Sequence, residues 1–154
     1  MAEVLSWLEG STLAAWTRES PSLWAYPTVL TLHTVGLSIV VGANAVIDLR
    51  LLGFAPRIPR QSLAFLFPVI WSAFAINAAS GVLLFIADAT TKSAQPVFYV
   101  KLACIGVALW MTVLARRLTG GRDPGAPASG TLIAALSLIF WSGAIVAGRL
   151  MAYL

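Results

Sequence analysis

Hydrophobic positions are gathered into four long runs along the chain, at residues 23–47, 63–87, 97–114 and 132–148. The segments between the runs hold most of the charged residues and much of the proline and glycine: DLRLLGFAPRIPRQ, DATTKSAQ and ARRLTGGRDPGAPAS. A helix needs about 20 apolar residues to cross a bilayer, and turns at a membrane surface collect polar residues, Pro and Gly. The pattern therefore predicts an all-α fold, an integral membrane four-helix bundle spanning residues 23–154.

The first 22 residues follow a different pattern, in which apolar and polar positions alternate irregularly. The apolar ones are Val4, Leu5, Trp7, Leu8, Leu13 and Trp16. This spacing predicts an amphipathic helix on the membrane surface, broken at Gly10. The segment carries three acidic residues and only Arg18 as a basic one, whereas a signal peptide opens with positive charge. We therefore expect a surface segment rather than a cleaved signal.

Composition supports a membrane protein and excludes most familiar enzyme classes. Of the 154 residues, 59% are hydrophobic and 10% are charged, against about 25% charged in soluble domains. The single cysteine, Cys104, leaves no internal disulfide and no Cys-x-x-Cys motif. The sequence also has no phosphate-binding loop, dinucleotide fingerprint, nucleophile elbow or zinc-protease motif. It therefore argues against an enzyme.

Basic residues predict the orientation in the membrane. Two of the polar segments hold six of the ten Lys and Arg residues: Arg50, Arg57, Arg60, Arg116, Arg117 and Arg122. Loops rich in Lys and Arg stay in the cytoplasm, so we expect both termini outside, in a bacterial inner membrane. The net charge of +4 is explained by this anchoring, and we expect the lipid bilayer, not nucleic acid, as its partner.

Polar and small residues recur at helical spacing within the runs. They form one stripe on each of three runs: His33, Gly36, Val40, Asn44 and Asp48; Ala73, Asn77, Ser80 and Gly81; Ser137, Trp141, Ala144 and Gly148. Residues three and four apart share a helix face, and small and polar residues mark the faces where membrane helices meet. We therefore predict that these stripes face the bundle interior.

The most specific feature is the only histidine, His33, in the first run. It follows Pro27 by six residues, which places it about 9 Å inside the membrane at 1.5 Å per residue. Lys101 and Cys104 lie at similar depth on the third run, and Arg149, Asp88 and Tyr26 lie near the same end. A polar side chain in hydrocarbon is a site hypothesis by default. We expect five of these side chains to converge in the outer half of the bundle: His33, Asp88, Lys101, Arg149 and Tyr26.

The run YPTVLTLHTVGLSIVVGANAVIDLRLLG resembles the first span of an uncharacterised family of small bacterial four-helix inner-membrane proteins. The segments SGVLLFIADATT, PVFYVKLACIGVAL and WSGAIVAGRLMAY fit the same pattern. In outline this family is similar to the membrane domain of CopD-type copper-import proteins and, more loosely, to b-type cytochrome bundles. The resemblance points to five positions for testing: His33, Asp48, Arg50, Lys101 and Arg149. The b-type cytochromes use paired histidines, and this chain has one.

One interpretation is a haem b or related tetrapyrrole site serving electron transfer. Imidazole is a standard axial ligand of haem iron. His33 would bind the metal, Gly36 would leave room for a flat ring, and Trp141 would line the interior. Lys101 and Arg149 would pair with the propionates. The sixth position would stay open or be filled by Met151 or by His33 of a second protomer.

Two other interpretations remain open at this stage. Copper handling would use His33, Cys104 and Met151, because soft thiolate and thioether ligands suit Cu(I). Alternatively, the chain is an accessory or structural subunit of a larger membrane complex, or a homo-oligomer, in which His33 only hydrogen-bonds to its neighbours.

Overall fold

The computed structural model describes residues 2–22, 24–119 and 128–153, and this part of the chain is helical with no strand. The helices, in chain order, are α1 (Ala2–Glu9), α2 (Thr12–Glu19), α3 (Tyr26–Leu51), the short 3-10 helix η1 (Arg60–Leu63), α4 (Leu66–Ile86), α5 (Ala89–Ala94), α6 (Pro96–Thr119) and α7 (Ala128–Leu150).

Four of these helices, α3, α4, α6 and α7, are long and apolar enough to cross a membrane. Many of their large apolar side chains face outward, among them Leu32, Val35 and Ile39 on α3. Such a surface belongs in contact with lipid rather than with water. The prediction of an all-α membrane bundle is confirmed, and the protein is a multi-pass membrane protein.

The first long helix continues further than the apolar run 23–47 predicted. Asp48 and Arg50 lie in the last turn of α3 and not in a loop. The helix ends where Gly53 adopts a left-handed φ of 100° and the Phe54 amide donates to the carbonyl of Leu49 at 3.0 Å. A left-handed glycine after the last turn is a common helix stop. Because α3 continues through Asp48, this residue is part of the helix, and its side chain is buried in the bundle.

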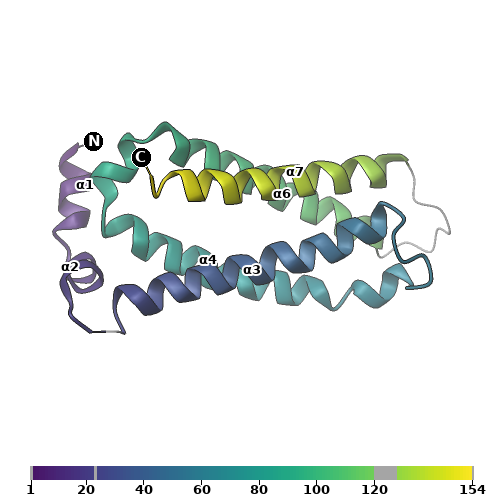
Figure 1. Ribbon diagram of the computed structural model, residues 1–154, viewed down its shortest axis with the longest axis horizontal. Helices are drawn as coiled ribbons and strands as arrows, with labels where there is room; N and C mark the ends of the chain where they lie inside the picture. Colours follow the sequence, from purple (N-terminus) through teal and green to yellow (C-terminus); the bar gives the residue numbers. More distant parts are fainter. Residues whose placement is uncertain (1, 23, 120–127, 154) are drawn as a thin grey trace.

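The long helices form two antiparallel hairpins, α3 with α4 and α6 with α7 (Figure 1). The hairpins meet mainly where α3 packs on α7; we call this contact the α3–α7 seam. The two chain ends lie at the same end of the bundle (Figure 1), which we call the terminal end. The opposite end, which carries the α3–α4 connection, is the loop end.

Small residues bring the helices of each hairpin close together. A Cβ at Gly36 of α3 would lie 3.1 Å from the carbonyl oxygen of Ala73 and 3.2 Å from the amide nitrogen of Asn77, both on α4. On the other hairpin, a Cβ at Gly143 of α7 would lie 3.3 Å from Sγ of Cys104 on α6. The stripes predicted from the sequence do face the interior, since Asn44, Asn77 and Ser137 are among the buried residues.

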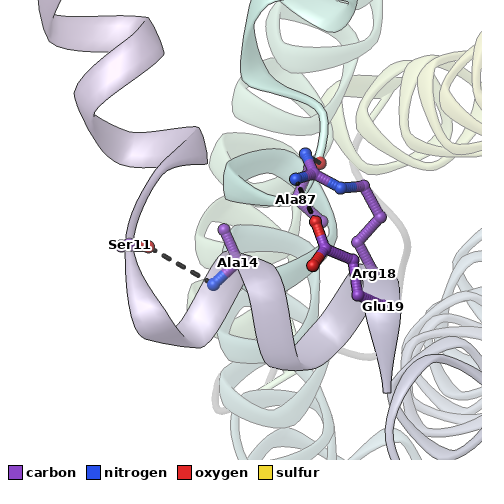
Figure 2. A network of polar contacts seen from close by, with 5 residues as sticks. All are labelled: Ser11, Ala14, Arg18, Glu19 and Ala87. Atoms are coloured by element: carbon purple, nitrogen blue, oxygen red, sulfur yellow. Dashed lines mark hydrogen bonds and ion pairs between the residues drawn. The ribbon is translucent and has the colours of Figure 1, made fainter. Parts of the chain in front are cut away.

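Helices α1 and α2 cross the terminal end of the bundle (Figure 1). The chain turns between them at Gly10 and Ser11, and Oγ of Ser11 accepts from the Ala14 amide at 3.3 Å (Figure 2). One face of α2 is buried on the bundle through Ala14 and Thr17. Large apolar side chains are exposed on both helices: Val4 and Trp7 on α1, and Leu13 and Trp16 on α2. This is the amphipathic arrangement expected of a surface segment.

One helix was not expected from the sequence. The sequence predicts a loop at the segment DATTKSAQ, but residues Ala89–Ala94 form the helix α5. The carboxylate of Glu9 on α1 accepts a hydrogen bond from the Thr90 amide at 2.7 Å. A carboxylate on the free amides of a first turn stabilises a helix start. Here that carboxylate comes from a residue far away in the sequence, so local pattern could not indicate it.

Candidate functional site

A cavity of about 770 Å³ lies between the two hairpins at the terminal end. All four long helices contribute to its wall, and α1, α2 and α5 contribute to its rim. Its lining residues are Glu9, Arg18, Tyr26, Leu30, His33, Gly81, Leu84, Phe85, Ala87, Asp88, Thr90, Thr91, Lys92, Phe98, Lys101, Gly148, Met151 and Ala152. Small-molecule sites in proteins are commonly about 300–1,000 Å³, so this cavity has the size of a ligand site.

His33 is held against α4 by one of its two ring nitrogens. Nδ1 lies 2.9 Å from the carbonyl oxygen of Asn77 and 3.2 Å from Oγ of Ser80. The Ser80 hydroxyl itself donates to helix carbonyls, and the Asn77 side-chain amide donates to the carbonyl of His33 at 2.7 Å. The Asn77 carbonyl can only accept, whereas the Asn77 side-chain amide, 3.3 Å from Nδ1, can only donate. The shorter contact, with the carbonyl at 2.9 Å, favours a hydrogen on Nδ1 of a neutral ring. Nε2 is then the nitrogen with a lone pair.

Gly81 makes this position of the ring possible. A Cβ at residue 81 would lie 3.0 Å from Cε1 of His33 and 3.4 Å from Nδ1. Any larger residue would therefore displace the imidazole from α4. The edge of the ring formed by Nδ1 and Cε1 is covered by α4, and the ring contributes to the cavity wall.

Of the three basic residues that line the cavity, Arg18, Lys92 and Lys101, only Lys101 has no carboxylate partner among the described residues. Its neighbours at the rim are engaged: Nζ of Lys92 lies 3.7 Å from Asp88, and Arg18 lies 2.7 Å from Glu19. A Cβ at Gly148 would lie 3.5 Å from Cε of Lys101, so the lysine stem runs along α7. The result is a half-buried ammonium group beside an apolar wall.

The rim at the terminal end is held by polar contacts from α1 and α2. Arg18 donates to the carbonyl of Ala87 at 3.3 Å and to the carboxylate of Glu19 at 2.7 Å (Figure 2). The hydrogen bond that Arg18 donates to Glu19 raises the pKa of Arg18. The Thr90 amide and hydroxyl lower the pKa of Glu9 below its ordinary value. Both charged groups therefore keep their charge while they fasten the N-terminal helices over the cavity.

The structure brings together some of the residues predicted for the site. His33, Lys101 and Met151 line the cavity, as do Tyr26 and Asp88. The three come from α3, from α6 and from the turn after α7. Within the described residues, however, no group of three or more His, Cys, Asp and Glu side chains is placed to hold a metal ion.

Four predicted residues lie elsewhere, and their expected roles need correction. The space beside Gly36 is filled by the α4 backbone, so no flat ring fits there. Trp141 is buried in the core at 2% exposure. Cys104 packs toward Gly143 rather than into the cavity. Arg149 is exposed, with its guanidinium 5.4 Å from the ring centre of Tyr153.

Sequence reasoning missed a second polar cluster in the bundle. Thr112 on α6 donates to Oδ1 of Asn44 on α3 at 2.7 Å, and both residues are buried. The signal was available, because Ala108, Thr112, Ala115 and Thr119 recur at helical spacing on the third run and just after it. These small residues form the buried face of α6.

No protein-family model matches the chain, and comparison with curated proteins and with solved structures gives no significant match. The resemblance to small bacterial four-helix membrane proteins therefore stays a prediction.

Proposed function

We propose that the cavity binds haem b or a related tetrapyrrole, with His33 as the axial ligand, and that the protein serves electron transfer in the membrane. One observation carries this proposal. Nδ1 of His33 is engaged with the carbonyl oxygen of Asn77 at 2.9 Å, which leaves Nε2 as the donor nitrogen on the wall of a cavity of about 770 Å³. Ligating histidines typically donate their other ring N–H to such an acceptor.

The remaining wall of the cavity suits an amphipathic macrocycle. Apolar side chains line it, and Phe85 and Phe98 stack with ring centres 5.1 Å apart. Lys101 supplies a cation for a propionate, and Met151 supplies a thioether that is known as an axial ligand in cytochromes. A bound haem would contribute reversible one-electron chemistry. The chain itself would orient the imidazole, exclude water and hold the carboxylates.

Among the described residues, the ligand set proposed for copper is less well supported. Cys104 lies outside the cavity lining that contains His33 and Met151, so the three ligands do not face one space. The accessory-subunit interpretation has better support, because the contacts of His33 with Asn77 and Ser80 also join α3 to α4. The accessory-subunit interpretation needs no ligand, so a test for bound haem distinguishes it from the haem proposal.

We further propose that the protein lies in a bacterial inner membrane with both termini outside, which would place the cavity in the outer half. The basic residues at the loop end support this orientation, since Arg116 and Arg117 form part of the last turn of α6 there.

The test is the visible spectrum of purified protein expressed with added haem. We expect a Soret band that disappears in His33→Ala and persists in Thr34→Ala, a neighbouring exposed position on α3. Lys101→Ala should weaken haem retention, whereas Arg149→Ala should not, because Arg149 lies outside the cavity lining. A folded wild-type protein that shows no Soret band with haem supplied would refute the haem proposal and leave the accessory subunit.

A further inference from the structure

A buried carboxylate lies at the α3–α7 seam, away from the cavity. Asp48, three residues before the end of α3, is 1% exposed, and its Oδ2 has no hydrogen-bond partner among the described residues. Ser137 on α7 is 0% exposed and interacts with Asp48, yet its Oγ also has no partner within hydrogen-bond criteria. Buried polar atoms without partners are rare in proteins, so two that face each other require an explanation.

The charged groups around Asp48 do not supply a counter-ion in the described part of the chain. Arg50 follows on the same helix but donates to the carbonyls of Ile58 and Pro56 at 2.6 and 3.1 Å. On α6 the nearest charged residues, Arg116 and Arg117, are exposed.

The other helices packed near Asp48, at the loop end of the bundle, add few charged residues. Helix α7 carries no charged residue before Arg149 at its far end, and α4 carries none. Arg60 on η1 is half-buried, and the ion pairs of the described residues do not include Arg60 with Asp48. An unpaired carboxylate in a low-dielectric interior is strongly unfavourable, so a small cation at Asp48 would stabilise the folded protein.

Among the described residues, the side chains at this place offer oxygen ligands. Asp48 Oδ2 and Ser137 Oγ are two that have no hydrogen-bond partner among the described residues. Asn44 lies one turn before Asp48 on α3 and accepts a hydrogen bond from Thr112 on α6. The Nε1 of Trp141, one turn from Ser137, is a donor without a partner and suits a water molecule next to the ion. Oxygen ligands select hard cations, not Cu(I) or other soft metals.

We infer that Asp48 and Ser137 form a site for a monovalent cation, either a sodium ion or a proton. The site lies at the seam that joins the two hairpins, so an ion held between α3 and α7 fastens one hairpin to the other. This inference does not rest on the haem proposal, because it uses other residues at another place in the bundle.

The experiment is thermal unfolding of purified protein in sodium or in a bulky organic cation, from about pH 5 to about pH 9. If sodium binds, the melting temperature rises by about 5 °C or more when sodium reaches saturation. If the proton binds, the melting temperature rises as the pH falls and does not respond to sodium. Asp48→Asn, which is isosteric and uncharged, should remove whichever dependence the wild type shows.

Two further variants complete the design. Asp88→Asn, at the terminal end and paired with Lys92, should keep the dependence of the wild type. Ser137→Ala should raise the cation concentration at half-saturation about tenfold, as loss of a supporting ligand does. A wild type that responds to neither sodium nor pH would overturn the inference, and so would a response retained in Asp48→Asn. An unchanged Soret band in Asp48→Asn would show that the loss of this cation site does not affect haem binding in the cavity.

Discussion

Substitution of Gly36 by alanine tests the helix packing that positions His33. The new Cβ would lie 3.1 Å from the carbonyl oxygen of Ala73 and 3.2 Å from the amide nitrogen and Cβ of Asn77. Two of these three atoms belong to the α4 backbone, which cannot rotate away, so α3 and α4 must separate by a few tenths of an ångström. The same movement would lengthen the hydrogen bonds between Asn77 and His33, now 2.7 and 2.9 Å.

A second glycine on the same helix provides the control. A Cβ at Gly42 would meet nothing within 4 Å, so Gly42→Ala gains helix propensity without a clash. Because that gain, about 0.5–1 kcal/mol, is common to both variants, their difference isolates the contact. Overpacking a tight interior costs about 1–3 kcal/mol, and we expect Gly36→Ala to be less stable than Gly42→Ala by that amount.

The assay is thermal unfolding of both variants in the same detergent, followed by circular dichroism. A difference of about 1–3 kcal/mol corresponds to roughly 3–10 °C in melting temperature for a chain of this size. Equal melting temperatures for Gly36→Ala and Gly42→Ala would show that α3 and α4 do not approach each other at this point. The placement of His33 against α4 would then be wrong as well.

Three further outcomes are expected. A cysteine introduced at Ser93 should react with an impermeant thiol reagent in intact cells and one at Ser129 should not; the reverse pattern would contradict the proposed orientation. Thr112→Val should lose about 0.6–1.7 kcal/mol of stability through its interhelical hydrogen bond, and Thr34→Val, which bonds only within its own helix, should lose less. The pKa of Glu9 is lowered by its hydrogen bonds with Thr90, so its contribution to the stability of the folded protein is complete above its ordinary pKa of 4.5 and is lost as the pH falls through the lowered pKa. Hydrogen exchange in α1 should therefore rise in that acid range in the wild type but not in Glu9→Gln.

Periodicity predicted the bundle because burial in lipid requires long apolar helices whatever their partners. It also predicted that His33, Lys101 and Asp88 lie near one another, and all three line the cavity, since depth along a helix follows directly from residue count. Depth does not give the direction in which a side chain points. Gly36 and Trp141 lie on the interior stripes, but they pack against neighbouring helices instead of facing the cavity.

Contacts between distant segments explain the other misses. The hydrogen bond between Glu9 and the Thr90 amide at the start of α5 joins residues 81 positions apart, so no local sequence pattern indicates it. Arg149 illustrates a different limit, because a cation at a helix end has water available and turns outward. The stripe on the first run placed Asp48 on the interior face, and Asp48 is buried. The apolar run ended one residue before it, however, and did not indicate that α3 continues to Leu51, close to the left-handed Gly53.

The pairing of the long helices also bears on how the chain is made. Each hairpin consists of helices that follow one another in the sequence, so α3 and α4 can pair before α6 and α7 have been synthesised. The two finished hairpins can then dock along the α3–α7 seam. A gene divided at the codon for Gln95, between α5 and α6, would give two polypeptides that each insert independently and reassemble in the bilayer.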